Sequence, residues 1–115
     1  MKRMSFALTK EQILDQTKTV TRRNGWVNLK AGDLIQPIEK GMGLKKGEKQ
    51  VLLGYPIEIL SVIFEPLCQI DTEDLIKEGF SNMSDEDFIT MYCKANKCDR
   101  NHIITRIEFC YTDPF

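Results

Sequence analysis

Short apolar and alternating runs, rather than long periodic stretches, organise most of this chain. Residues 4–8 (MSFAL) are apolar and predict a short buried strand, and residues 51–64 predict a longer strand with a bend at Tyr55-Pro56. Near the end, HIITRIEFCYT alternates two sets of side chains, as a strand with two different faces does. These runs indicate a sheet with at least three strands.

Two further strands are expected between the first and the longest of these runs. Residues 17–23 (TKTVTRR) are rich in β-branched side chains and lead into Asn24-Gly25, a common turn dipeptide. Residues 34–40 (LIQPIEK) contain a proline, which suits an edge strand or a bulge. The glycine- and lysine-rich residues 41–50 lack apolar periodicity and predict a loop.

Three segments predict helices that begin at a capping residue. Thr9, with a glutamine three positions later, forms a capping box for a helix to about residue 16. Asp71 precedes a second helical segment, and Ser84, with an aspartate three positions later, precedes a third at about residues 85–95. The third helix has one apolar face, formed by Phe88, Met91 and Tyr92.

This order of elements predicts one α+β domain over residues 1–115, and we expect its sheet to curl into a small β-barrel with flanking helices. The sequence has no apolar run of the roughly 18–20 residues that a membrane helix needs, and its first residues do not form a signal peptide. We therefore expect a cytoplasmic protein, with no membrane partner and with its four cysteines as free thiols.

Charge is distributed unevenly along the chain. Residues 1–50 contain eleven Lys or Arg against five acidic residues, whereas residues 51–115 contain five against twelve. The first half can therefore present a basic face to phosphate groups, although folding can also pair the two halves and neutralise them.

No metal or other cofactor is expected. Cys93, Cys98 and His102 are chemically suitable zinc ligands, but their C-x4-C-x3-H spacing is looser than that of the usual zinc fingers. We interpret them as a helix residue, a loop residue and a residue at the entrance of the last strand.

The motif K-T-x-T-x-R at residues 18–23, followed by Gly25-Trp26 and by Ala31-Gly32-Asp33, resembles the motif of the ASCH domains. The loop GLKKGEK and the terminal TRIEF strand extend the resemblance over nearly the whole chain, most closely to small stand-alone versions found in phages and prophages. The resemblance implies a PUA-like fold, a β-barrel with flanking helices that often binds RNA, and a ligand cleft between strand and helices.

One similar bacterial group consists of amidohydrolases that remove the acetyl group from acetylated cytidine. The resemblance implies that Lys18 and Thr21 are catalytic, together with Glu78, whose alignment is looser. A threonine hydroxyl needs a neighbouring base, and a lysine serves as one if burial or nearby cations lower its pKa. A carboxylic acid then passes the proton to the departing amine.

The spacing of Lys18 and Thr21 raises a geometric question. Side chains alternate along a regular strand, so residues three apart point to opposite faces, whereas Thr19 and Thr21 share one. Lys18 and Thr21 can share a site only if the chain turns or bulges between them.

Binding of RNA or of a modified nucleoside is the leading functional prediction, with the amidohydrolase as the first alternative. Trp26 can stack on an exposed base, and the cations can bind phosphates. A packed tryptophan and solvated cations are the structural alternatives. The predicted ligand-binding residues are Thr19, Arg22, Arg23, Trp26, Lys30, Lys45 and Lys46. A ribonuclease is the second alternative, although His102, the one histidine, lies far from the motif.

Overall fold

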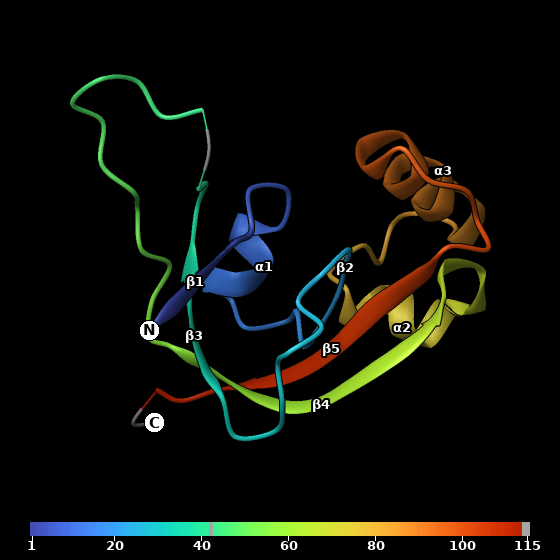
Figure 1. Cartoon of the computed structure of the whole chain (residues 1–115), viewed down its shortest axis with the longest axis horizontal. Helices are drawn as coiled ribbons and strands as arrows, with labels where there is room; N and C mark the ends of the chain where they lie inside the picture. Colours follow the sequence, from blue (N-terminus) through green and yellow to red (C-terminus); the bar gives the residue numbers. More distant parts are fainter. Residues whose placement is uncertain (42, 114–115) are drawn as a thin grey trace.

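A five-stranded mixed sheet forms the centre of the molecule (Figure 1), whose computed structural model describes residues 1–41 and 43–113. The strand order is β1-β3-β4-β5-β2, with β1 parallel to β3 and the other neighbours antiparallel. The strands are β1 (Lys2–Ser5), β2 (Val20–Arg23), β3 (Leu34–Ile38), β4 (Ile57–Pro66) and β5 (Ile103–Tyr111). The two long strands, β4 and β5, pair along most of their length and support the short ones.

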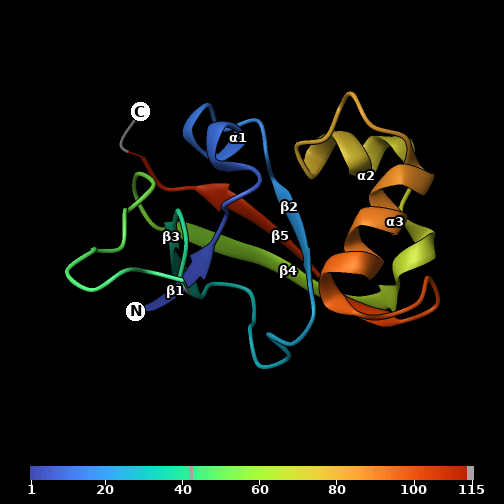
Figure 2. The ribbon, with the colours of Figure 1, turned by 90° about the horizontal axis from the view of Figure 1, so that it is seen from above.

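The sheet is not closed, so the expected barrel is wrong, although the α+β class is correct. In the described part of the chain, β1 and β2 are the two edge strands and do not pair with each other (Figure 2). The backbone of Thr19, just before β2, instead donates to the carbonyl of Lys77 at the end of a helix. Between the edges, the Arg23 side chain donates to the Ser5 carbonyl at 2.7 Å. A side chain therefore bridges the gap that a ladder of backbone hydrogen bonds would have closed.

Three α-helices accompany the sheet in the described residues: α1 (Lys10–Leu14), α2 (Thr72–Lys77) and α3 (Asp85–Asn96). Two predicted caps are confirmed, because the Asp71 side chain accepts from the Asp74 amide and the Ser84 side chain from the Asp87 amide. The capping box at Thr9 is wrong, since its side chain makes no capping hydrogen bond. A 3-10 turn, Leu67–Gln69, links β4 to the segment before α2.

Two apolar clusters form the core. One lies beneath α1 and contains Phe6, Ile59 and Phe109; the other joins α2 and α3 to the sheet and contains Leu75 and Phe88. Burying each such side chain stabilises the fold by about 1.5–3 kcal/mol. The clusters hold α3 at one end of the sheet, while the loop between β3 and β4 projects at the opposite end in both views (Figures 1 and 2).

Several strand boundaries differ from those predicted. The first strand is Lys2–Ser5 rather than residues 4–8, and β4 begins at Ile57, since Leu52 forms only an isolated bridge to Ile38. The strand containing Pro37 lies inside the sheet rather than at its edge, which is possible because its pairing with β4 covers only residues 34 and 35. Within the described ranges, no helix has the length and apolarity to cross a membrane.

Candidate functional site

A cavity of about 380 Å³ lies beside the unpaired edges of β1 and β2, where a closed barrel would have joined them. The segment after β1, the segment containing β2, the end of α2 and one face of α3 form its walls. Its polar and charged lining residues are Ser5, Thr9, Lys18, Thr21, Arg22, Arg23, Asn24, Glu78, Tyr92 and Asn96. This volume lies within the usual range for small-molecule sites.

Lys18 and Thr21 line the same cavity, which answers the question raised by their spacing. Strand β2 begins only at Val20, so Lys18 lies in the irregular segment before it and strand alternation does not govern its direction. Its amide donates to the carbonyl of Gln12, and its own carbonyl accepts from the Tyr111 hydroxyl. The backbone at Lys18 is thus held from both sides.

Glu78 lies at the end of α2 and contacts Lys18 through two groups. The Lys18 Nζ atom is 3.1 Å from Glu78 Oε1 and also donates to the Glu78 carbonyl. Gly79 follows with φ of +96°, and a Cβ there would lie 3.0 Å from the Gln12 side chain. Glycine therefore permits both the turn after α2 and the close approach of α1 that fix Glu78.

Burial lowers the pKa of the Lys18 amine, because removal from water disfavours its charged form. The Glu78 carboxylate opposes this shift, while the guanidinium groups of Arg23 and Arg22 add to it. A lysine with a lowered pKa supplies more neutral amine near neutral pH, and that form accepts protons.

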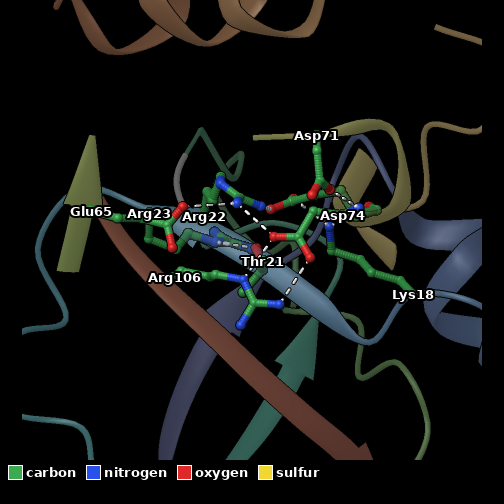
Figure 3. Close-up of polar contacts among 9 residues, drawn as sticks. Lys18, Thr21, Arg22, Arg23, Glu65, Asp71, Asp74 and Arg106 are labelled. Atoms are coloured by element: carbon green, nitrogen blue, oxygen red, sulfur yellow. Dashed lines mark hydrogen bonds and ion pairs between the residues drawn. The ribbon is translucent and has the colours of Figure 1, made fainter. Parts of the chain in front are cut away.

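Arg22 is the centre of a buried ion-pair network (Figure 3). Its guanidinium contacts Asp74 at 2.6 Å, Glu78 at 3.2 Å and Glu65 at 3.3 Å, and its side chain is only 1% exposed. Arg106 donates to both Asp74 oxygens, from Nε to Oδ2 at 2.7 Å and from Nη2 to Oδ1 at 2.9 Å. The network fixes Glu78 but leaves the Arg22 Nε atom without a hydrogen-bond partner among the described residues.

The same network depresses the pKa of the Asp74 carboxyl. Hydrogen bonds from Arg106 contribute most to this shift; burial opposes it, and the hydrogen bond from Arg22 lowers the pKa further. Asp74 therefore remains ionised and anchors α2 to strands β2 and β5.

Thr21 and Arg23 lie two residues apart on β2 and contact each other. The Arg23 Nε atom donates to Thr21 Oγ1 at 3.0 Å, and the Arg23 guanidinium lies 4.7 Å from the centre of the Phe6 ring. Since the Thr21 oxygen accepts this bond, its proton is left for a different acceptor. Burial is the main cause that lowers the pKa of Arg23.

Aromatic side chains supply much of the remaining wall. Trp26, Phe80, Phe88 and Tyr92 line the cavity, and the Tyr92 hydroxyl donates to Asn24 Oδ1 at 2.6 Å. This bond links α3 to the turn after β2. Tyr92 lies on the helix face predicted to be apolar, and neither Asn24 nor Phe80 is a predicted site residue, because nothing local indicates which side chains meet across a cavity.

Four predicted ligand residues do not line this cavity. Lys30, Lys45 and Lys46 are exposed, the latter two on the loop that projects away from α3. Thr19 is half-buried and uses its backbone to bind Lys77 and Phe109.

No group of three or more His, Cys, Asp or Glu side chains in residues 1–41 and 43–113 is arranged to hold a metal ion. Cys93, Cys98 and two further cysteines are free thiols, and His102 is exposed.

Comparison with solved structures identifies the fold as ASCH-like. The chain superimposes on an ASCH domain from Lactobacillus crispatus JV V101 with a TM-score of 0.61 and 14% identity, over 95% of this chain and 77% of the other. A protein of family DUF984 from Enterococcus faecalis V583 gives a TM-score of 0.66 and 12% identity, over 97% and 76%. No protein-family model and no curated protein matches the sequence. The predicted ASCH resemblance is thus confirmed for the fold, and the phage origin stays a prediction.

Proposed function

We propose that the cavity binds a cytidine-like nucleoside and that the protein hydrolyses an acyl group from the exocyclic amine of that nucleoside. One observation carries this proposal: Lys18, Thr21 and Glu78, drawn from two distant parts of the chain, line a single cavity of nucleoside-accommodating size. Such convergence of a buried amine, a hydroxyl and a carboxylate is one arrangement that can activate a nucleophile for acyl transfer.

The proposed reaction begins at Thr21. Neutral Lys18 takes the hydroxyl proton, and Thr21 Oγ1 attacks the acyl carbonyl carbon. Glu78, 3.1 Å from the Lys18 amine, passes this proton to the exocyclic nitrogen as the bond between carbon and nitrogen breaks. The acyl group is then carried by Thr21, and cytidine is released.

A water molecule completes the cycle. Lys18 accepts one water proton while the water oxygen attacks the ester carbon, and Thr21 regains its proton as the free acid leaves. In the described residues, the Lys18 amine and the Thr21 hydroxyl are not hydrogen-bonded to each other. Hydrogen bonds between catalytic groups often form only when the substrate is bound.

Hydrolysis of acetylated cytidine, followed by chromatography, tests this proposal. Wild type is expected to release cytidine, and Lys18→Met, which keeps the apolar stem but removes the amine, is expected to lower turnover about a hundredfold or more. Lys94→Gln removes an exposed cation of α3 and serves as the matched control. Wild type without turnover at high enzyme concentration would refute the amidohydrolase.

Binding of an unpaired RNA nucleotide without hydrolysis is the second candidate. The partly buried Trp26 and the neighbouring aromatic residues of the cavity favour it, because every base has a face that can stack on an aromatic ring. The ASCH-like fold is compatible with either function. This candidate predicts salt-dependent RNA affinity, measured by fluorescence anisotropy, that Lys18→Met leaves largely intact.

A ribonuclease gains no support from the site. His102, the histidine of the sequence, is exposed at the start of β5 and does not line the cavity.

A further inference from the structure

Two half-buried thiols, Cys93 and Cys98, lie together at the C-terminal end of α3. The helix ends in a left-handed turn, because Lys97 has a φ of 53° and the Cys98 amide donates to the Cys93 carbonyl at 3.2 Å. This hydrogen bond is characteristic of the Schellman motif, a helix end at which the side chains of the two bonded residues commonly pack together. The C-x4-C spacing is therefore the spacing that this helix end brings together.

The surroundings of the two thiols support contact between them. Both pack against the apolar cluster that contains Leu75 and Phe88, and both remain partly exposed. Burial raises the pKa of the Cys98 thiol, and a hydrogen bond with Cys93 and the charge of a Cys93 thiolate raise it further. The two sulfur atoms are thus neighbours before any bond joins them.

The other two cysteines lie in different surroundings. Cys68 belongs to the 3-10 turn after β4, and its thiol donates to Asn101 Oδ1 at 3.7 Å. Its amide donates to the carbonyl of Arg100, and Cys110 lies on β5. The thiols that the end of a single helix holds together are therefore those of Cys93 and Cys98.

We propose that Cys93 and Cys98 are a thiol–disulfide modification site, which low-molecular-weight disulfides such as oxidised glutathione convert into an intramolecular disulfide. This inference does not depend on the proposed amidohydrolase function. In proteins kept in reducing compartments, disulfides are usually transient and sense the redox state or take part in catalysis.

The modification consists of two thiol–disulfide exchanges. The thiolate of one cysteine attacks a sulfur atom of oxidised glutathione, so that a protein–glutathione S–S bond forms and one glutathione thiolate leaves. The thiolate of the second cysteine then attacks the protein sulfur of this mixed disulfide, which forms the intramolecular S–S bond and releases the second glutathione. The two protons of the protein thiols end on the two released glutathione molecules. Reduced glutathione reverses both steps.

The modification site adjoins the cavity wall. The residues of the last turns of α3 that line the cavity are Met91, Tyr92, Ala95 and Asn96. The Asn96 side chain also donates to the Tyr92 carbonyl at 3.0 Å, within the same turn. A disulfide between residues 93 and 98 closes a covalent ring around Asn96, so we expect oxidation to slow the local opening of this turn.

Peptide mass spectrometry after oxidation of the folded full chain tests the proposal. Trypsin cuts after both lysines between the two cysteines, so the peptides of residues 78–94 and 98–100 stay together only if a disulfide joins them. We expect oxidised glutathione to give this linked pair as the main disulfide between protein cysteines, and dithiothreitol to separate it. Cys93→Ser is expected to keep glutathione on Cys98, because no second thiol displaces it there. Cys68→Ser removes a thiol from the same apolar cluster, and as the matched control it should still give the linked pair.

The native helix end itself is tested against the unfolded chain. At equilibrium, the ratio of intramolecular disulfide to mixed disulfide should be at least about tenfold higher in the folded chain than in urea, because the helix end holds the thiols in contact. Hydrogen exchange of the Cys98 amide should be at least about tenfold slower in the oxidised protein than in the reduced protein.

The contrary outcomes are equally specific. A linked peptide pair that contains Cys68 in place of either cysteine of α3 overturns the proposal, as do mixed disulfides on both cysteines of α3 without a linked pair. An equal ratio in the folded chain and in urea also overturns it, since the helix end then contributes nothing. Unchanged exchange of the Cys98 amide overturns the inferred restraint on the last turn of α3.

Discussion

The Lys18 amine lies 3.1 Å from the Glu78 carboxylate, and both side chains are 3% exposed although 60 residues separate them. A buried pair of this kind contributes little stability beyond what apolar residues would provide, since both charges lose their hydration. The pair lines the same cavity as Thr21, and the proposed reaction gives it a chemical role there. The pair connects the end of α2 to the chain before β2 and places a potential base and acid at the same point.

The two threonines of the motif are expected to behave differently. Thr21→Val should lower turnover of acetylated cytidine about a hundredfold or more, because valine keeps the shape but has no nucleophile. Thr19→Val should retain at least about half of the wild-type rate, since Thr19 does not line the cavity and its hydrogen bonds to Lys77 and Phe109 use its backbone. Equal losses in the two variants would contradict the assignment of Thr21.

Turnover should depend on the protonation of Lys18. Its pKa is lowered by burial, so the neutral amine forms as pH rises through a value below the usual 10.5, and kcat/KM should rise over that range. Arg23 contributes to the lowering, so the residual activity of Arg23→Gln should show its ascending limb at higher pH than wild type. A pH–rate profile of each enzyme gives the pH of its ascending limb. Ascending limbs at the same pH in wild type and Arg23→Gln would contradict the assignment of this limb to Lys18.

Asp74 is expected to make the fold sensitive to acid. Its folded-state pKa is depressed below 3.8 by Arg106 and Arg22, so the stability that it contributes is present above that pH and lost as pH falls below it. Asp74→Asn should lower the free energy of unfolding on the order of 2 kcal/mol at neutral pH. It should also flatten the dependence of that free energy on pH in acid. Urea unfolding at several pH values measures both effects.

Local signals in the sequence predicted much of the fold. Asp71 and Ser84 cap their helices through contacts three residues away, and the alternation of residues 103–111 reflects a strand with two different environments. Thr9 has the same local signal but no cap, because Gln12 instead donates to the Gly79 carbonyl, 67 residues distant. Closure of the sheet was mispredicted for a similar reason, since it depends on whether strands far apart in sequence meet.

The candidate site was predictable only in part. The resemblance to the ASCH-domain amidohydrolases indicated Lys18, Thr21 and Glu78, and the cavity brings these three together. The motif does not indicate that Arg22 is neutralised, because the carboxylates that contact it come from residues 43 to 56 positions away. The aromatic wall on α3 and the turn after α2 likewise depend on tertiary contacts.

The most direct test of the cavity as the ligand site is the response of backbone amide NMR signals to added cytidine. We predict that the largest shifts occur within residues 5–9, 18–26 and 88–96, the segments that contribute most of the lining side chains, and that residues 43–50 of the basic loop remain unchanged. Shifts concentrated in that loop, with the cavity residues unaffected, would contradict the account.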